Sequence, residues 1–282
     1  MHYEMKRQGV KKMGYILKQK SKVKYLTISS FEESGLVKHG FSTRIGGFSK
    51  APYDTLNLGL KKDDDKATVM QNYRAICDAL EIKLSDLVSS DQVHENDVYL
   101  VKKSDRGKGI TKQSDIVAKD ALITNEKNVA LVTYYADCVP LFFLDTITPA
   151  IGLAHAGWRG TVKMIGQKTL NKMADVFGSN PKDILVGIGP CINKCCYEVD
   201  EPVVYEFRKT FNYWEKLVEK KSDNHWMLDL VLANRLQLEN AGIDKSNISI
   251  CEFCTSCRND LFFSHRADDK KTGSLAAFIQ LI

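Results

Sequence analysis

The chain has 282 residues, of which 44% are hydrophobic and 27% charged, and its formal net charge is +5. This composition is ordinary for a globular protein and excludes collagenous, disordered and low-complexity chains. The charge excess is too mild to indicate a nucleic-acid-binding protein. The basic segment 1–24 lacks the apolar core of a signal peptide, and no run elsewhere reaches the length of a membrane span. We therefore expect a cytoplasmic protein with no membrane partner.

Helix and strand patterns alternate in the first half of the chain. Residues 67–80 place Val69, Tyr73, Ile76 and Leu80 at helical spacing, and the acidic run 63–65 before them is typical of a helix start. Short apolar runs that suit buried strands follow at 97–101, 128–135, 140–144 and 150–153.

The second half of the chain predicts three further helices, at 161–177, 200–211 and 229–241, and strands at 184–188, 248–251, 261–264 and 275–279. Gly178 supplies a stop for the first of these helices, and Pro202 fits the first turn of the second. Because many strands follow one another without an intervening helix, we predict a single α+β domain with mixed β-sheets flanked by helices. We expect the domain to span 25–282, with segment 1–24 outside it.

A cysteine and a histidine are predicted to meet at one sheet edge. If residues 139–145 form a strand, 146–149 a turn and 150–155 the returning strand, the outward and return paths nearly cancel. Cys138 and His155 then lie side by side. His94, directly before the strand expected at 97–101, completes a His/His/Cys set. Three protein ligands with an open fourth position are what a catalytic zinc uses to activate water.

Two arginines next to glycine-rich turns are candidates for binding an anion. Gly157 and Gly160 precede the helix predicted at 161, whose N-terminal amides would face the same sheet edge, and Arg159 adds a positive charge there. Arg44 lies in a second basic motif, residues 39–47, where a strand leads into a turn at Gly46 and Gly47.

A cysteine-rich run, C-x2-C-x2-C, occupies residues 251–257 and resembles part of an iron–sulfur or zinc ligand set. It lacks a convincing fourth ligand nearby, although Cys191, Cys195 or Cys196 could supply one through folding. We expect Cys251, Cys254 and Cys257 to be reduced thiols around a strand end, not ligands of an iron–sulfur cluster. A metal knuckle that binds nucleic acid is a non-enzymatic alternative, but no aromatic–basic stripe accompanies these cysteines.

Several motifs together resemble the YfiH, or laccase-domain, family from about residue 37 to the C-terminus. They are HGFSTR at 39–44, GG at 46–47, LNLG at 56–59, QVH at 92–94, ADC at 136–138, HAGWRG at 155–160, GIGPCI at 187–192, CYEV at 196–199 and FFSHR at 262–266.

The resemblance implies a single α+β domain with a catalytic zinc held by His94, Cys138 and His155. It further implies phosphorolysis of adenosine, inosine and S-methyl-5′-thioadenosine, and deamination of adenosine. Where the family motif often has Gly after the first histidine, this chain has Glu95. The older name of the family, multicopper polyphenol oxidase, fits less well, because blue-copper and trinuclear centres together need more imidazoles than the six histidines of this chain.

The mechanism expected from these residues is electrostatic and metal-assisted. Arg44 and Arg159 position phosphate against C1′ of the ribose, while the zinc or a group near it stabilises the departing purine. In deamination, Asp137 is the candidate proton carrier for the water that attacks C6. A role attached to bacterial members, the editing of peptidoglycan precursors, leaves an alternative: amide hydrolysis with Cys138 as nucleophile and His155 as its base.

Overall fold

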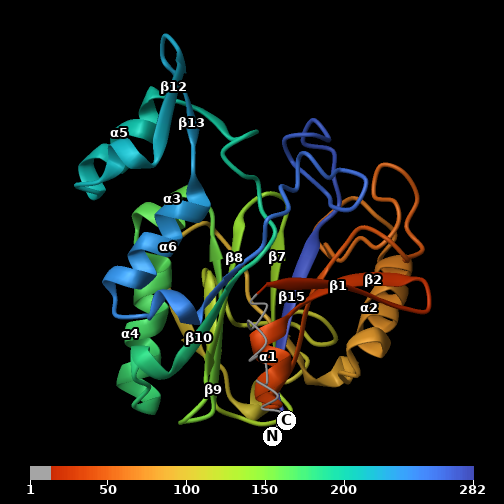
Figure 1. Ribbon diagram of the computed structural model, residues 1–282. Coiled ribbons are helices and arrows are strands. Elements are labelled where there is room, and N and C mark those ends of the chain that lie inside the picture. Colours follow the sequence, from red (N-terminus) through yellow and green to blue (C-terminus); the bar gives the residue numbers. More distant parts are fainter. Residues whose placement is uncertain (1–13) are drawn as a thin grey trace, which may run out of the picture.

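The computed structural model describes residues 14–282, which form two six-stranded sheets between layers of helices (Figure 1). The first sheet has the order β1-β2-β3-β15-β7-β4. Its strands are β1 (Tyr15–Lys20), β2 (Val23–Ile28), β3 (Val37–Ser42), β15 (Leu275–Leu281), β7 (Ala130–Tyr135) and β4 (Leu87–Ser89). Only β4 and β7 pair in parallel within this sheet.

The second sheet has the order β14-β10-β8-β9-β6-β5. Its strands are β14 (Ile248–Ile250), β10 (Ile184–Ile188), β8 (Val139–Asp145), β9 (Ala150–Ala156), β6 (Ala121–Thr124) and β5 (Val98–Leu100). The two outer pairs, β14 with β10 and β6 with β5, are parallel and the inner pairs are antiparallel. Both sheets are therefore mixed, as predicted.

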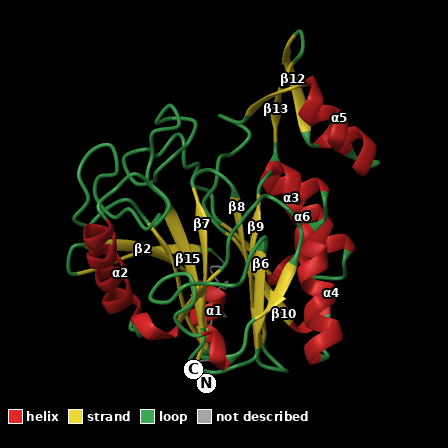
Figure 2. Ribbon diagram, turned by 180° about the vertical axis from the view of Figure 1, so that it is seen from behind, coloured by secondary structure: helices red, strands yellow, loops and turns green. Residues whose placement is uncertain are grey.

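The helices are α1 (Ser29–Ser34), α2 (Lys66–Leu80), α3 (Trp158–Val162), α4 (Ile165–Phe177), α5 (Glu201–Thr210) and α6 (Leu230–Asn240). Of these, α2, α3, α4 and α6 cover the outer faces of the two sheets, whereas Phe31 of α1 packs between the sheets. Figures 1 and 2 show α2 on one side of the molecule and α3, α4 and α6 on the other. A small sheet of β11 (Glu198–Asp200), β13 (His225–Leu228) and β12 (Val218–Ser222) projects with α5 at the upper left of Figure 1.

Side chains alternate along the central strands and build three apolar layers. In β8, Leu141 and Phe143 pack toward α4 and α6, whereas Phe142 and Leu144 pack between the two sheets. In β15, alternate residues pack between the sheets, while Phe278 packs toward α2. Because both faces of these strands are buried, β8, β9 and β15 are apolar over nearly their whole length.

Most predicted elements are confirmed, and they include α2, α5, α6, β5, β7, β8, β9, β10, β14 and β15. The predicted signals mark the start of α2 and the end of α4. At the start of α2, the Asp65 side chain accepts a hydrogen bond from Thr68 N, and Gly178 ends α4 with a left-handed backbone (φ 74°). Within the N-terminal segment 1–24, which we expect outside the domain, residues 1–13 lie outside the residues that the structure describes. Residues 15–20 form β1, which pairs with β2 along its length.

Two predictions of secondary structure are wrong. The single helix at 161–177 is divided into α3 and α4, because Met164 has a left-handed backbone (φ 62°) that cannot continue a right-handed helix. The strand at 261–264 is a turn. Its apolar side chains are buried as a strand's would be, but its backbone bonds irregularly, for example from Arg44 N to Leu261 O at 2.9 Å. Apolar runs of this length do not by themselves distinguish a strand from a buried loop.

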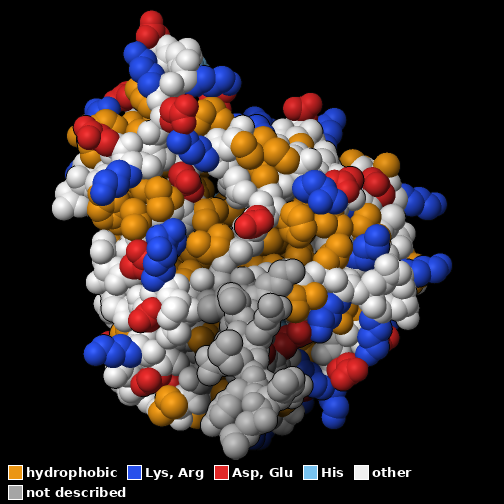
Figure 3. Space-filling view, viewed as in Figure 1, with side chains coloured by type: hydrophobic (Ala, Val, Ile, Leu, Met, Phe, Trp, Pro, Cys, Tyr) orange, Lys and Arg blue, Asp and Glu red, His pale blue; other side chains and the backbone are white. Residues whose placement is uncertain are grey.

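Charged side chains of both signs are interspersed on the face seen in Figure 3, without a broad basic patch. This distribution agrees with the small charge excess of the sequence. Within residues 14–282, no helix combines the length and the apolar character that crossing a membrane requires.

His39 makes the stability of the first sheet sensitive to acid. Its ring in β3 is buried, and Nε2 accepts a hydrogen bond from Ile28 N at 2.7 Å, which requires an unprotonated nitrogen. Burial lowers the pKa of His39 to about 4. As the pH falls, His39 in the unfolded chain therefore binds a proton near pH 6.5, whereas His39 in the folded chain binds it only near pH 4. We expect unfolding free energy to fall by about 3 kcal/mol across this window, with no such loss above pH 6.5.

Denaturant titrations at several pH values test this expectation. His39→Gln retains an acceptor for Ile28 N but does not titrate, so the difference in unfolding free energy between wild type and variant should change between pH 6.5 and 4. Parallel curves for the two proteins would show that His39 does not cause the acid sensitivity.

Candidate active site

The hairpin of β8 and β9 brings Cys138 and His155 together as predicted. Its register pairs Pro140 with His155 and Val139 with Ala156, so Cys138, one residue before β8, lies beside the end of β9. His94 reaches the same place from the loop before β5. The ligand atoms of His94, Cys138 and His155 all lie within 4.8 Å of one another. The structure therefore assembles the predicted set from three separate segments.

Asp120 positions both histidines of this set. Its buried carboxylate accepts hydrogen bonds from the backbone amides of Val93, His94 and Glu95 at 3.1, 3.0 and 2.8 Å. The same carboxylate lies 2.8 Å from Nδ1 of His155, which leaves Nε2 of that ring for the site. The three amides hold the loop in a shape that gives His94 a left-handed backbone (φ 61°), uncommon for a residue other than glycine.

Sequence reasoning misses Asp120 because nothing in its local sequence distinguishes it. It is one aspartate immediately before the short apolar strand β6. Only the pairing of β6 with β9, which sets Ala121 opposite Ala154, brings the Asp120 carboxylate to His155. A carboxylate that orients a metal-binding histidine is a usual second layer of such sites.

The ionisation of Cys138 and His155 is coupled. Burial alone would raise the pKa of Cys138, but the charge of His155 and hydrogen bonds to His155 and His94 lower that pKa to about 6. Burial alone would lower the pKa of His155, but the Cys138 thiolate and Asp120 raise it to about 9. Without a metal, the lowered pKa of Cys138 and the raised pKa of His155 favour the thiolate–imidazolium pair over the neutral pair. A thiolate is also the form that a metal binds.

Gly157 leaves room for the ligands. A Cβ on this residue would lie 2.9 Å from His94 Nδ1 and 3.0 Å from Cys138 Sγ, closer than real side chains tolerate. Gly157 precedes α3, so helix formation starts at Trp158 and not at the predicted residue 161. The helix has only 5 residues.

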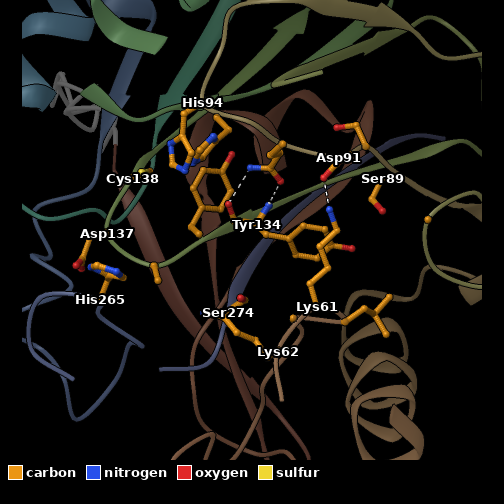
Figure 4. A pocket seen from close by; sticks show the side chains of 18 of the residues that line it. Lys61, Lys62, Ser89, Asp91, His94, Tyr134, Asp137, Cys138, His265 and Ser274 are labelled. Carbon is orange, nitrogen blue, oxygen red and sulfur yellow. Dashed lines mark hydrogen bonds and ion pairs between the residues drawn. The ribbon is translucent and has the colours of Figure 1, made fainter. Parts of the chain in front are cut away.

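A cavity of about 850 Å³ opens beside His94, Cys138 and His155 (Figure 4). This volume is in the range of sites for small molecules. Aromatic rings of Tyr134, Trp158 and Tyr197 contribute to its walls, and these side chains are only partly buried.

Two of the cations that line the cavity have no acidic partner among residues 14–282. The exposed Arg159 guanidinium lies over the Trp158 ring, 4.3 Å from its centroid, and makes no ion pair within this range. Lys62 is half-buried, and its desolvation lowers its pKa. Lys61, by contrast, pairs with Asp91 (Figure 4). The predicted role of Arg159 agrees with this placement, whereas Lys62 was not singled out by the sequence.

Arg44 requires a correction, because it does not line the cavity. Its guanidinium donates to Asp54 O at 2.9 Å and to Asn259 O at 3.0 Å, and it lies 4.6 Å from the centre of the Phe263 ring. The neighbouring amides of Gly46 and Gly47 are also occupied, since both donate to Thr55 Oγ1. Arg44 and its glycine-rich turn join distant loops and do not form an anion site.

Asp137 lines the cavity and has a left-handed backbone (φ 88°). Its Oδ1 accepts from Thr255 Oγ1 at 2.6 Å and its Oδ2 from Arg266 N at 2.8 Å. His265, the residue before Arg266, lines the cavity on the same side in Figure 4. Asp137 thus connects the site to the segment after β14, a contact that the sequence does not indicate.

Glu95 directs its charge away from the candidate ligands. Its carboxylate pairs with Lys163 at 2.5 Å, at the break between α3 and α4, and it is not among the residues that line the cavity. The departure from the family motif at this position therefore changes how the His94 loop is anchored.

Replacing Asp120 should weaken metal binding. Asp120→Asn removes the charge that orients His155. It also places an amide NH2, which cannot accept hydrogen bonds, against the backbone N–H donors of the His94 loop. We therefore expect the affinity of the protein for zinc to fall by about 10- to 100-fold. Competition with a chromophoric chelator measures this affinity. The matched control is Asp97→Asn, whose exposed carboxylate pairs with Lys119 in the same region and should leave the affinity unchanged. An Asp120→Asn protein with wild-type affinity would contradict the assigned role.

Comparison with known proteins identifies the family of the chain. Residues 38–282 match the family model described as multi-copper polyphenol oxidoreductase laccase. The chain is 41% identical over 241 residues to the purine nucleoside phosphorylase YlmD of Bacillus subtilis (strain 168). The matched region covers 85% of this chain and 87% of that protein.

Two solved structures share the fold. The hypothetical protein YfiH of Bacillus licheniformis has a TM-score of 0.89 and 36% identity, covering 94% of this chain and 99% of that one. YlmD from Geobacillus stearothermophilus has a TM-score of 0.88 and 39% identity, covering 95% and 99%. The predicted single α+β domain and the predicted resemblance are thus confirmed, and the chain belongs to the laccase-like family that contains YfiH and YlmD.

Proposed function

We propose that this chain is a zinc-dependent purine nucleoside phosphorylase that acts on adenosine, inosine and S-methyl-5′-thioadenosine and also deaminates adenosine. The observation that carries the proposal is the convergence of His94, Cys138 and His155 on a cavity that also holds cations without acidic partners. The name shared by the relatives from Bacillus subtilis and Geobacillus stearothermophilus, purine nucleoside phosphorylase, supports the reaction class.

The donor set fits zinc. Two imidazoles and one thiolate are typical zinc ligands, and a tetrahedral ion with bonds of about 2.0–2.3 Å requires ligand atoms about 3.3–3.8 Å apart. The three ligand atoms here lie within 4.8 Å of one another, and the cavity leaves a fourth position accessible. Zinc, when bound, polarises the leaving group or activates water.

A multicopper centre finds less support in the placement of the histidines. Of those in residues 14–282, only His94 and His155 belong to a group of possible metal ligands, and His265 lines the cavity outside that group. His39 bonds to Ile28 N, and His225 lies 3.1 Å from a Glu198 oxygen in the small sheet. Blue-copper and trinuclear centres need more imidazoles than such an arrangement offers.

The cavity walls suit a nucleoside and phosphate. The rings of Trp158, Tyr134 and Tyr197 offer flat apolar surfaces for a purine. In phosphorolysis a phosphate oxygen bonds to C1′ of the ribose while the bond from C1′ to the purine breaks and the purine takes up a proton. We assign Arg159 to the phosphate, because its free guanidinium can form paired hydrogen bonds to two phosphate oxygens.

Deamination needs a group that moves a proton from water to the leaving nitrogen, and we assign this role to Asp137. Each of its carboxylate oxygens already accepts one hydrogen bond, from Thr255 or from Arg266 N. Each oxygen has a second lone pair available to a proton. The two existing bonds hold the carboxylate at the cavity wall.

Arg159→Ala tests the phosphate site. Loss of a charge-assisted contact worth about 1.5–3 kcal/mol should lower phosphorolysis of adenosine or inosine by about one to two orders of magnitude, and deamination by less. The assay measures free base and ribose 1-phosphate with and without added phosphate. Lys168→Ala is the matched control, because Lys168 is an exposed lysine of α4 that does not line the cavity. Base release that does not depend on phosphate, or full activity in Arg159→Ala, contradicts the proposal.

Asp137→Asn tests the proton carrier. The amide preserves the size of the side chain but cannot take up a proton, so deamination should fall by at least about 100-fold. Phosphorolysis should decline less, because Asp137 has no assigned step in it. Ammonia release and ribose 1-phosphate formation, followed in the same preparations, separate the two effects. Equal losses in both reactions would indicate that Asp137 only positions the loop.

Amide hydrolysis by Cys138 is the second candidate function, and the thiolate–imidazolium pair of Cys138 and His155 favours it. The two functions differ in their need for metal. Hydrolysis of muropeptides that survives chelation and is abolished by Cys138→Ala would support the thiol nucleophile. Nucleoside activity that is lost on chelation and restored by zinc would support the phosphorylase.

A further inference from the structure

A second group of sulfur atoms lies outside the cavity. Cys195 and Cys196 come from the loop between β10 and β11, and Cys254 and Cys257 come from the segment after β14. All four Sγ atoms lie within 4.8 Å of one another. Four thiols gathered from two distant segments indicate a ligand set.

This group includes two cysteines of the cysteine-rich run 251–257, for which the sequence left a further ligand open among Cys191, Cys195 and Cys196. The run does find further ligands, since the fold brings Cys195 and Cys196 to Cys254 and Cys257. Cys251 takes no part in the group and is buried in the protein interior. Two backbone contacts hold the loops in place: a bridge between Cys191 and Cys254, and a hydrogen bond of 2.9 Å from Thr255 N to Cys191 O.

The distances fit one tetrahedral ion. Sulfur atoms bound at about 2.3 Å to the same zinc are about 3.8 Å apart. The Sγ atoms of Cys195 and Cys196 are 3.8 Å apart, and Cys257 Sγ lies 3.6 Å from the first and 3.3 Å from the second. A cluster of several irons would place the thiolates on different metal atoms and therefore farther apart.

The surroundings also suit bound thiolates. Asn193 N donates to Cys254 Sγ at 3.4 Å, the kind of amide contact that stabilises a metal-bound sulfur. The Arg266 guanidinium donates to the carbonyl of Cys196 at 3.0 Å, so a fixed positive charge lies next to the group.

We propose that Cys195, Cys196, Cys254 and Cys257 bind one structural Zn²⁺, distinct from the metal of the active site. Four thiolates form a closed coordination shell with no position for substrate, which is typical of a structural zinc. The ion joins the loop at 189–197 to the segment at 251–266. These two segments supply Tyr197 and Arg266 to the cavity wall, so the ion stabilises one side of the active site from outside.

Elemental analysis of the full-length protein tests the proposal. The double variant Cys254→Ser/Cys257→Ser should contain one zinc per chain fewer than wild type. Cys138→Ala should retain the zinc of the four cysteines, so the loss of the active-site metal and the loss of this metal are distinguishable. The matched control is Cys251→Ala, a buried cysteine of the same segment, and it should keep wild-type zinc content. Equal zinc in wild type and the double variant overturns the proposal.

Cobalt substitution provides a test that does not depend on the folding of the double variant. Cys138→Ala protein loaded with Co²⁺ should show the strong visible bands and sulfur-to-cobalt charge transfer of tetrahedral tetrathiolate cobalt. Cys195→Ser in the same background should weaken and shift these bands. A spectrum without tetrathiolate bands overturns the proposal, as does bound iron with sulfide, or a disulfide among these four cysteines found by mass spectrometry of freshly purified protein.

Discussion

The buried carboxylate of Asp120 is the constraint on which the candidate active site depends. Its oxygens accept hydrogen bonds from three consecutive backbone amides of the His94 loop, and one of them also contacts the ring of His155. One side chain therefore sets the position of two candidate ligands from different segments. A carboxylate buried in this way is stable only because every nearby donor is directed at it. The pKa of Asp120 is lowered accordingly: burial opposes ionisation, but the bonds from His155 and the amides outweigh it.

Two residues of the site have unusual backbone geometry. His94 and Asp137 have a left-handed backbone, which residues other than glycine rarely adopt. At His94 and Asp137 the conformation is held by hydrogen bonds to Asp120, Thr255 and Arg266. Gly157 contributes by having no side chain, since the absence of a Cβ lets the side chains of His94 and Cys138 lie close to its backbone. These contacts fix the backbone conformation next to the candidate ligands.

The contrast between Arg44 and Arg159 shows what separates a cation that joins loops from one that is free to bind an anion. Both lie within two residues of a glycine and both contact an aromatic ring. Arg44 is surrounded by the acceptors of Asp54 and Asn259, which use its donors to join loops. Arg159 faces the cavity and has no acidic partner among the described residues, so its donors remain free for an anion. A glycine-rich turn accompanies both arginines, and their tertiary surroundings separate them.

The sequence by itself determined the α+β class, most helices and strands, and the meeting of Cys138 with His155. These features follow from periodicity and from the length of one hairpin, which are local properties of the chain. Only the tertiary structure decided the role of Asp120, the exclusion of Arg44 and the gathering of Cys195 and Cys196 with Cys254 and Cys257. Each of these depends on the pairing of strands far apart in the chain, such as β6 with β9 or β10 with β14. Such pairing results from the packing of whole sheets, and no local pattern of residues encodes it.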